Sequence, residues 1–299
     1  MVGRMAGDKA RHPRKLLLAL MTVLVVIAVI TAWAIAEHAR HADGDDAATR
    51  TAAPLPVIPI PDVEPITLGE RPSEAEMTDI RAQLDAVFGG SRYAVLVADA
   101  TDGTVRVDID SNESFTAAST YKLFTAYSMA SAVETGAMSW DTTLAGNTLA
   151  GCMETMLVDS DNTYPVAWLT DVVGNAGMTT QTHALGATST FWGSNQVTTT
   201  ATDLTLVLQG YYRGSLLSAD STTRILSLLE RQRYRDGIPA GMAKRGVTRV
   251  ADKVGFLGGF LHDAGIVYTP KGDFTIVVLT EGSSWDAIAK ATAVIYDAL

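Results

Sequence analysis

The stretch FTAASTYKLFTAY, Phe115–Tyr127, places a serine and a lysine three residues apart at the start of an apolar run. Residues i and i+3 share one face of a helix, so Ser119 and Lys122 are expected to point the same way. Amide groups in a first helical turn lack partners within the helix, so the N–H of Ser119 is free to help hold an oxyanion. The pair predicts either a nucleophile beside its base or an ordinary helix start with a solvated lysine.

Two more polar patterns follow along the chain. The tripeptide S-D-N, residues 160–162, lies in LVDSDNTYPVAWL, and K-V-G, residues 253–255, lies in VADKVGFLGGFL. Ser, Asp and Asn are also typical of helix caps, and a strand lysine is also typical of a sheet edge, where it blocks aggregation. A glycine in a strand, however, permits close approach of a ligand or another backbone.

The order of the expected elements predicts the architecture. A capping box of Ser73 and Glu76 begins a helix that Gly89 ends. The remaining expected elements are strands at 93–98 and 104–109, a mostly helical middle at 119–241, strands at 248–255, 265–269 and 274–279, and a last helix at 284–299. Strands from both ends of the chain predict one α/β domain interrupted by a helical insertion.

In this order, S-x-x-K, S-D-N and K-x-G are the motif set of penicillin-recognising serine enzymes. The chain resembles the class A β-lactamase family over roughly residues 74–299, and the stretches FTAASTYKL, TTTATDL, RDGIPAGM and HDAGIVY carry the same resemblance. The resemblance implies an α/β (α+β) fold, in which an antiparallel sheet is flanked by helices and joined to an all-helical subdomain at about 119–245.

The resemblance also implies four catalytic residues. Ser119 is the expected acyl-accepting nucleophile, and Lys122 is the group expected to activate it. Ser160 is expected to relay a proton to the leaving nitrogen. Lys253 is expected to supply positive potential for the site and for the substrate carboxylate.

Substrate binding is expected at four positions. Asn162 is expected to hold the amide side chain of the substrate, and the N–H of Phe256 is expected to share the oxyanion with that of Ser119. Val254 and Gly255 complete the expected contacts. Where the family usually has a hydroxyl that meets the substrate carboxylate, Val254 donates no hydrogen bond.

A second departure concerns the release of the acyl group. The family carries a glutamate between S-D-N and TTT that activates the deacylating water, and residues 163–197 contain no glutamate. Asp171 falls in a helical run and is a poor substitute; His183 is a possible base, although a surface histidine is the simpler interpretation. The sequence therefore predicts slow deacylation.

Composition narrows the function further. Apolar residues make up 47% of the chain, and the formal net charge is −10, which argues against a nucleic-acid partner. The single cysteine, Cys152, excludes an internal disulfide and is expected to be a buried core residue. No motif for a metal or another cofactor is present, so none is expected, and we expect a monomer.

The N-terminal segment predicts export. Residues 16–36 are uncharged and apolar, long enough to span a bilayer, and five basic residues precede them. We expect a cytoplasmic tail at 1–15, a transmembrane anchor at 16–36, an extracellular Pro/Ala-rich linker at 37–70 and the serine hydrolase domain at 71–299 on the cell exterior. A cleaved signal peptide ending at Ala34–Ala36 is the alternative, and it exports the same domain.

These observations predict a membrane-anchored extracellular serine hydrolase that forms an acyl-serine intermediate with a β-lactam or a D-alanyl cell-wall peptide. The alternative from another class is a catalytically silent wall-binding or scaffolding module on the same fold. An exported esterase with no role at the cell wall is a third interpretation.

Overall fold

The computed structural model describes residues 58–59 and 62–299. The expected cytoplasmic tail and anchor, and much of the linker, lie outside the described residues. Within those residues, no helix has both the length and the apolar character needed to cross a membrane.

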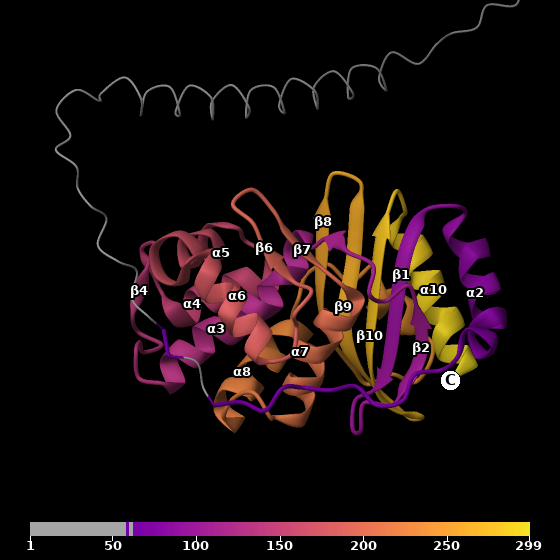
Figure 1. Ribbon diagram of the computed structural model, residues 1–299, viewed down its shortest axis with the longest axis horizontal. Helices are drawn as coiled ribbons and strands as arrows, with labels where there is room; N and C mark the ends of the chain where they lie inside the picture. Colours follow the sequence, from indigo (N-terminus) through magenta and orange to yellow (C-terminus); the bar gives the residue numbers. More distant parts are fainter. Residues whose placement is uncertain (1–57, 60–61) are drawn as a thin grey trace, which may run out of the picture. The chain divides into compact units, whose positions relative to one another are not determined.

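A five-stranded antiparallel sheet forms the centre of the domain, in the order β2-β1-β10-β9-β8 (Figure 1). The strands are β1 (Arg92–Asp99), β2 (Val105–Ile109), β8 (Arg249–Leu257), β9 (Phe260–Thr269) and β10 (Gly272–Glu281). The predicted α/β fold with an antiparallel sheet built from both ends of the chain is therefore confirmed.

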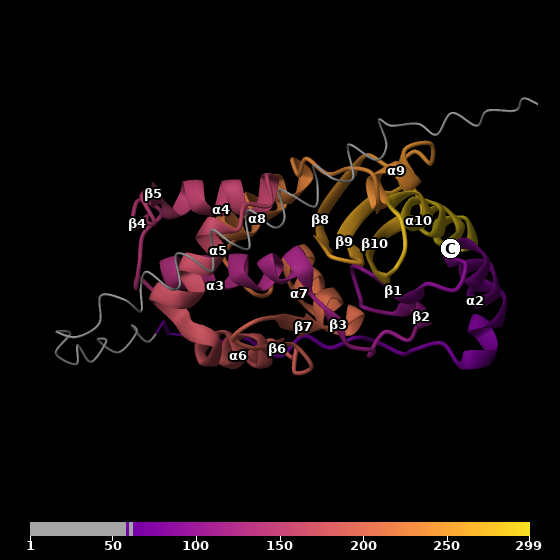
Figure 2. The ribbon, with the colours of Figure 1, turned by 90° about the horizontal axis from the view of Figure 1, so that it is seen from above.

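Alternate residues of β1 face two different cores, because successive strand residues point to opposite faces of a sheet. Ala94, Leu96 and Ala98 belong to the core that the sheet shares with the helical block. Val95 and Val97 belong to a second core with helices α2 (Glu74–Phe88), α9 (Ile238–Met242) and α10 (Trp285–Ala298). The sheet is thus covered on both faces, as Figure 2 shows.

The N-terminal helix of the domain begins and ends where the sequence predicts. The Ser73 hydroxyl accepts from the Glu76 N–H, the Glu76 carboxylate accepts from the Ser73 N–H, and Gly89 ends the helix with a positive φ of 59°. The last helix, α10, also has an N-cap serine: the Ser284 hydroxyl accepts from the Ala287 N–H.

The middle of the chain forms the helical block. Its helices are α3 (Lys122–Glu134), α4 (Leu149–Val158), α5 (Thr163–Trp168), α6 (Gly174–Ala184), α7 (Ala201–Arg213) and α8 (Ala219–Glu230), and a π-helical turn (Leu169–Val173) joins α5 to α6. Cys152 is fully buried in its core, as expected.

Short strands interrupt this helical block, which the sequence pattern did not predict. β6 (Phe191–Trp192) and β7 (Val197–Thr199) form a hairpin that pairs with β3 (Phe115–Thr116), just before Ser119. A second hairpin consists of β4 (Thr143–Leu144) and β5 (Asn147–Thr148). The strands are two or three residues long, too short for a period-two pattern to be recognised.

Candidate active site

Ser119 lies on a 3₁₀ turn, Ala118–Tyr121, that runs directly into α3 at Lys122. Ala118 has a positive φ of 45°, a conformation that is costly for a residue with a Cβ. The Thr120 hydroxyl holds the turn from within by donating to the Ala117 carbonyl at 2.6 Å. The local backbone therefore fixes the direction of the Ser119 side chain.

Lys122 is fully buried and contacts three residues of the expected site. Its Nζ lies 2.9 Å from Ser119 Oγ, 2.7 Å from the Ser160 carbonyl oxygen and 2.7 Å from Asn162 Oδ1. The Ser160 hydroxyl lies slightly farther from Nζ, at 3.3 Å. The lysine is thus held against the serine by oxygen acceptors from the S-D-N segment.

Ser160 lies between α4 and α5, with a positive φ of 60°. Asp161 stabilises this loop by accepting from the Thr163 N–H at 2.7 Å. Lys253 Nζ, which comes from β8, donates to Ser160 Oγ at 2.9 Å and to the Val254 carbonyl at 3.0 Å. The hydroxyl of Ser160 therefore lies between the two lysines.

Burial lowers the pKa of both lysines. Desolvation, together with the positive charge of Lys253, lowers the pKa of Lys122 to about 7. Desolvation lowers the pKa of Lys253 to about 8, although the nearby carboxylates of Asp252 and Asp263 oppose this shift. At neutral pH, a large fraction of Lys122 is the neutral amine that a proton acceptor must be.

Two buried carboxyl groups lie behind Lys253. Burial raises the pKa of Asp252 well above its usual range and that of Asp263 to about 6. Arg235 forms an ion pair with Asp252, and Asp263 accepts from the Ile238 N–H at 2.7 Å. Sequence reasoning missed this pair, although acidic residues inside the apolar runs VADKVGF and LHDAGIVY are an available signal.

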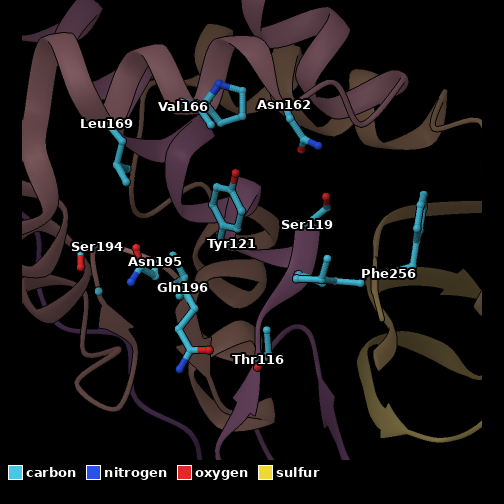
Figure 3. A pocket seen from close by; sticks show the side chains of 15 residues that line it. Thr116, Ser119, Tyr121, Asn162, Val166, Leu169, Ser194, Asn195, Gln196 and Phe256 are labelled. Atoms are coloured by element: carbon cyan, nitrogen blue, oxygen red, sulfur yellow. The ribbon is translucent and has the colours of Figure 1, made fainter. Parts of the chain in front are cut away.

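A cavity of about 260 Å³ opens in front of Ser119 (Figure 3). Asn162 and Val166 lie on one side, and Phe256 lies on the side of the sheet. The turn of the β6–β7 hairpin, residues 193–196, lines the cavity on the side opposite Phe256 and was not predicted as part of the site (Figure 3).

Two of the four expected substrate-binding residues line this cavity. Asn162 and Phe256 are in its wall, whereas Val254 is fully buried and neither it nor Gly255 lines the cavity. The two alternative bases, Asp171 and His183, are exposed and do not line it either.

The family model described as the beta-lactamase enzyme family matches residues 76–299, three quarters of the chain. The chain belongs to the beta-lactamase enzyme family. It is a class A β-lactamase-like serine hydrolase of the β-lactamase and penicillin-binding type, which confirms the resemblance predicted from the motifs.

Solved structures of this type share the fold. PBP-A is 21% identical, with a TM-score of 0.68 over 78% of this chain and 98% of PBP-A. A PBP-A mutant, solved as an acyl-enzyme complex with penicillin G, is 21% identical, with a TM-score of 0.67 over the same shares of the two chains. A β-lactamase from Streptosporangium roseum is 22% identical, with a TM-score of 0.67 over 76% of this chain and 98% of its own. The comparison with curated proteins gave no match.

Gly255 brings β8 against the turn that carries Ser119. A Cβ on this residue would lie 3.0 Å from the Ala117 carbonyl oxygen and 3.1 Å from the Ser119 nitrogen. We expect Gly255→Ala to push the turn outward by a few tenths of an ångström and to lower the rate of serine acylation by roughly 10–100-fold, since such rates are sensitive to small displacements. Stopped-flow acylation by a fluorescent penicillin measures this effect; an unchanged rate in a folded variant would contradict it.

A buried histidine beside the site has a structural function. His262 Nε2 lies 2.8 Å from the Thr116 carbonyl oxygen, and Nδ1 accepts from the Thr280 N–H at 3.1 Å. Burial lowers the pKa of His262 to about 4, so the ring is neutral and its Nε2 donates to Thr116. His262 thereby ties β9 and β10 to the segment that precedes Ser119.

Proposed function

We propose that this member of the beta-lactamase enzyme family is a membrane-anchored extracellular enzyme that forms an acyl-serine at Ser119 with a β-lactam or a D-alanyl cell-wall peptide, and that it releases the acyl group slowly. The observation that carries the proposal is the 2.9 Å contact between Ser119 Oγ and the buried Nζ of Lys122, whose pKa lies near neutrality.

Hydrogen-bond accounting supports Lys122 as the base. A neutral amine has two N–H groups and one lone pair. The two N–H groups match the two acceptors at 2.7 Å, the Ser160 carbonyl and Asn162 Oδ1. The lone pair then faces the Ser119 hydroxyl and can take its proton as Oγ attacks the substrate carbonyl carbon.

Ser160 and Lys253 are placed to assist the second half of acylation, in which the C–N bond of the substrate breaks and the leaving nitrogen takes a proton. Because Lys253 donates to Ser160 Oγ, the hydroxyl hydrogen of Ser160 is available to another acceptor. When the C–N bond of the substrate breaks, Ser160 gives this proton to the leaving nitrogen and is reprotonated from Lys122. The positive charge of Lys253 favours this transfer by stabilising the oxygen of Ser160.

The side chains that line the cavity support slow deacylation. Among the described residues that line it, none is a carboxylate or a histidine that could activate water. A positioned general base typically contributes about 10²–10⁴-fold to a rate. The acyl-enzyme is therefore expected to be long-lived, because Lys122 is left as the nearest base.

The sequence carries the remaining parts of the proposal. The apolar run at 16–36, with basic residues before it, supports a single-pass anchor with the catalytic domain outside the cell. We propose that the domain acts as a monomer.

Intact-mass spectrometry after exposure to penicillin G tests the proposal. We expect a covalent adduct of one penicillin per chain, mapped to the peptide that contains Ser119, with a lifetime of minutes or longer. The absence of any adduct together with no hydrolysis would favour the silent wall-binding module. Rapid hydrolysis without an accumulating adduct would refute slow deacylation.

The rate of acylation should depend on pH in a bell shape. Lys122 must be neutral and loses its proton near pH 7, whereas Lys253 must be charged and loses its proton near pH 8. The rate should rise about sixfold from pH 6 to pH 7.5 and fall by a similar factor by pH 9. Acylation by a fluorescent penicillin across this range measures it, and a flat profile between pH 6 and pH 7.5 would contradict the assignment of Lys122.

A further inference from the structure

The wall of the cavity carries no charge. Of the described residues that line it, none is Asp, Glu, Lys, Arg or His. The two lysines of the site are fully buried, absent from the lining, and already hydrogen-bonded. A charged acyl substituent lying against this wall would lose water and would contact no oppositely charged side chain there.

Much of the wall is apolar and is exposed at the mouth of the cavity. Val166 and Leu169 lie on the side of α5, and Phe256 and Leu257 lie on the side of β8. Val166, Phe256 and Leu257 are 52%, 44% and 59% exposed, respectively. Large apolar side chains exposed together are typical of a binding surface. A bound apolar group would cover these side chains.

The aromatic part of this wall is held in place. The ring of Phe256 makes edge contacts with Tyr234, at a centroid distance of 5.2 Å, and with Trp285, at 6.4 Å. Contacts of this geometry stabilise aromatic pairs and fix their orientation. Phe256 therefore offers a preformed surface for a flat apolar group.

Three carboxamides contribute to the polar part of the wall, beside the hydroxyl side chains. Asn162 lies on the side of α5, and Asn195 and Gln196 lie on the turn of the β6–β7 hairpin (Figure 3). A carboxamide both donates and accepts hydrogen bonds, so it suits an amide group of a substrate. The lining thus combines apolar contact with amide recognition. The cavity volume of about 260 Å³ is slightly below the roughly 300–1,000 Å³ of most ligand pockets.

From this lining we infer that the cavity selects an uncharged acyl group of the arylacetamide type and rejects acyl groups that bear an ammonium or a carboxylate. The inference rests on the proposed acylation of Ser119. It favours acyl donors with apolar side chains over wall peptides whose acyl portion is charged.

Three penicillins that share one nucleus test the selection. Their side chains are phenylacetamido, its α-amino derivative and its α-carboxy derivative, so they differ only in a hydrogen, an ammonium or a carboxylate. The second-order rate constant of adduct formation is measured for the full chain by intact-mass spectrometry. We expect the uncharged compound to react at least about tenfold faster than either charged one. A ratio below tenfold for either charged compound would overturn the inference.

A charge added to the wall should alter the selection in a defined direction. Leu257 is exposed, so Leu257→Lys adds an ammonium at the mouth, and Leu257→Gln is the uncharged control. The lysine variant should react at least fivefold faster with the α-carboxy compound than the natural chain does, and the glutamine variant should not. A smaller gain, or an equal gain in both variants, would contradict the inference.

The failure of this inference differs from the failure of the proposed function. If none of the three penicillins forms an adduct and none is hydrolysed, the proposed acylation of Ser119 by penicillins is refuted. If all three form adducts at similar rates, acylation stands and the selection by the cavity is refuted.

Discussion

Replacing Ser119 by alanine is expected to abolish the penicillin adduct completely. The substitution removes the only hydroxyl that lies both in the cavity wall and within 2.9 Å of Lys122 among the described residues. A water molecule is a poor nucleophile in place of the Ser119 hydroxyl, because no bond to the backbone holds the water against Lys122. Intact-mass spectrometry at a concentration that saturates the natural chain measures the loss.

Ser227→Ala is the matched control for this variant. Ser227 lies on α8 outside the cavity, and its hydroxyl bonds only to the Arg224 carbonyl. It should form the adduct as fast as the natural chain. Because the Ser119 hydroxyl has a single side-chain partner, Ser119→Ala should change the free energy of unfolding by less than about 1.5 kcal/mol. A stable adduct in folded Ser119→Ala protein would remove Ser119 from the mechanism.

Replacing Lys122 should lower the rate of acylation by about 10²–10⁴-fold, the usual contribution of a positioned general base. Lys122→Met keeps the length of the side chain and removes the amine. Lys122→Arg keeps a positive charge that cannot be removed at neutral pH. If the lysine acts as a base, both variants should lose activity to a similar degree, as pre-steady-state labelling with a fluorescent penicillin will measure.

The two variants separate two functions of the lysine. If Lys122→Arg retains more than about a tenth of the natural rate, the positive charge rather than proton transfer explains the effect of Lys122. Circular dichroism is needed alongside, because Lys122→Met leaves the Ser160 carbonyl and Asn162 Oδ1 without their donor.

Local sequence rules predict the ends of the first helix and the central strands of this fold well. The capping box at Ser73 and the glycine end at Gly89 appear where the sequence indicates. β1 and β10 also lie where the sequence predicts, because they are continuous apolar segments buried on both faces. Such elements depend on near neighbours in the chain, which the sequence displays directly. β9 begins at Phe260, five residues before the expected strand at 265–269.

The meeting of the three motifs in one site could be predicted only from the resemblance to the family. Spacing alone left Ser119 and Lys122 open to a plain structural interpretation. The contact between Lys122 and Ser160 joins residues 38 positions apart, which local patterns cannot predict. The positive φ of Ser160 was not predictable, because serine rarely adopts it and the surrounding fold imposes it. The β6–β7 turn was missed for a similar reason, since tertiary contacts hold its short strands.

The central position of β10 has a consequence for how the protein is made. β10 pairs with β1 on one side and with β9 on the other, so within the sheet it links the two early strands to β9 and β8. The sheet that joins β1 to β8 is therefore complete only after synthesis has passed Glu281, near the end of the chain. A translating ribosome, or a secretion channel that passes the chain in order, would therefore hold a precursor whose central sheet is incomplete until that last strand emerges.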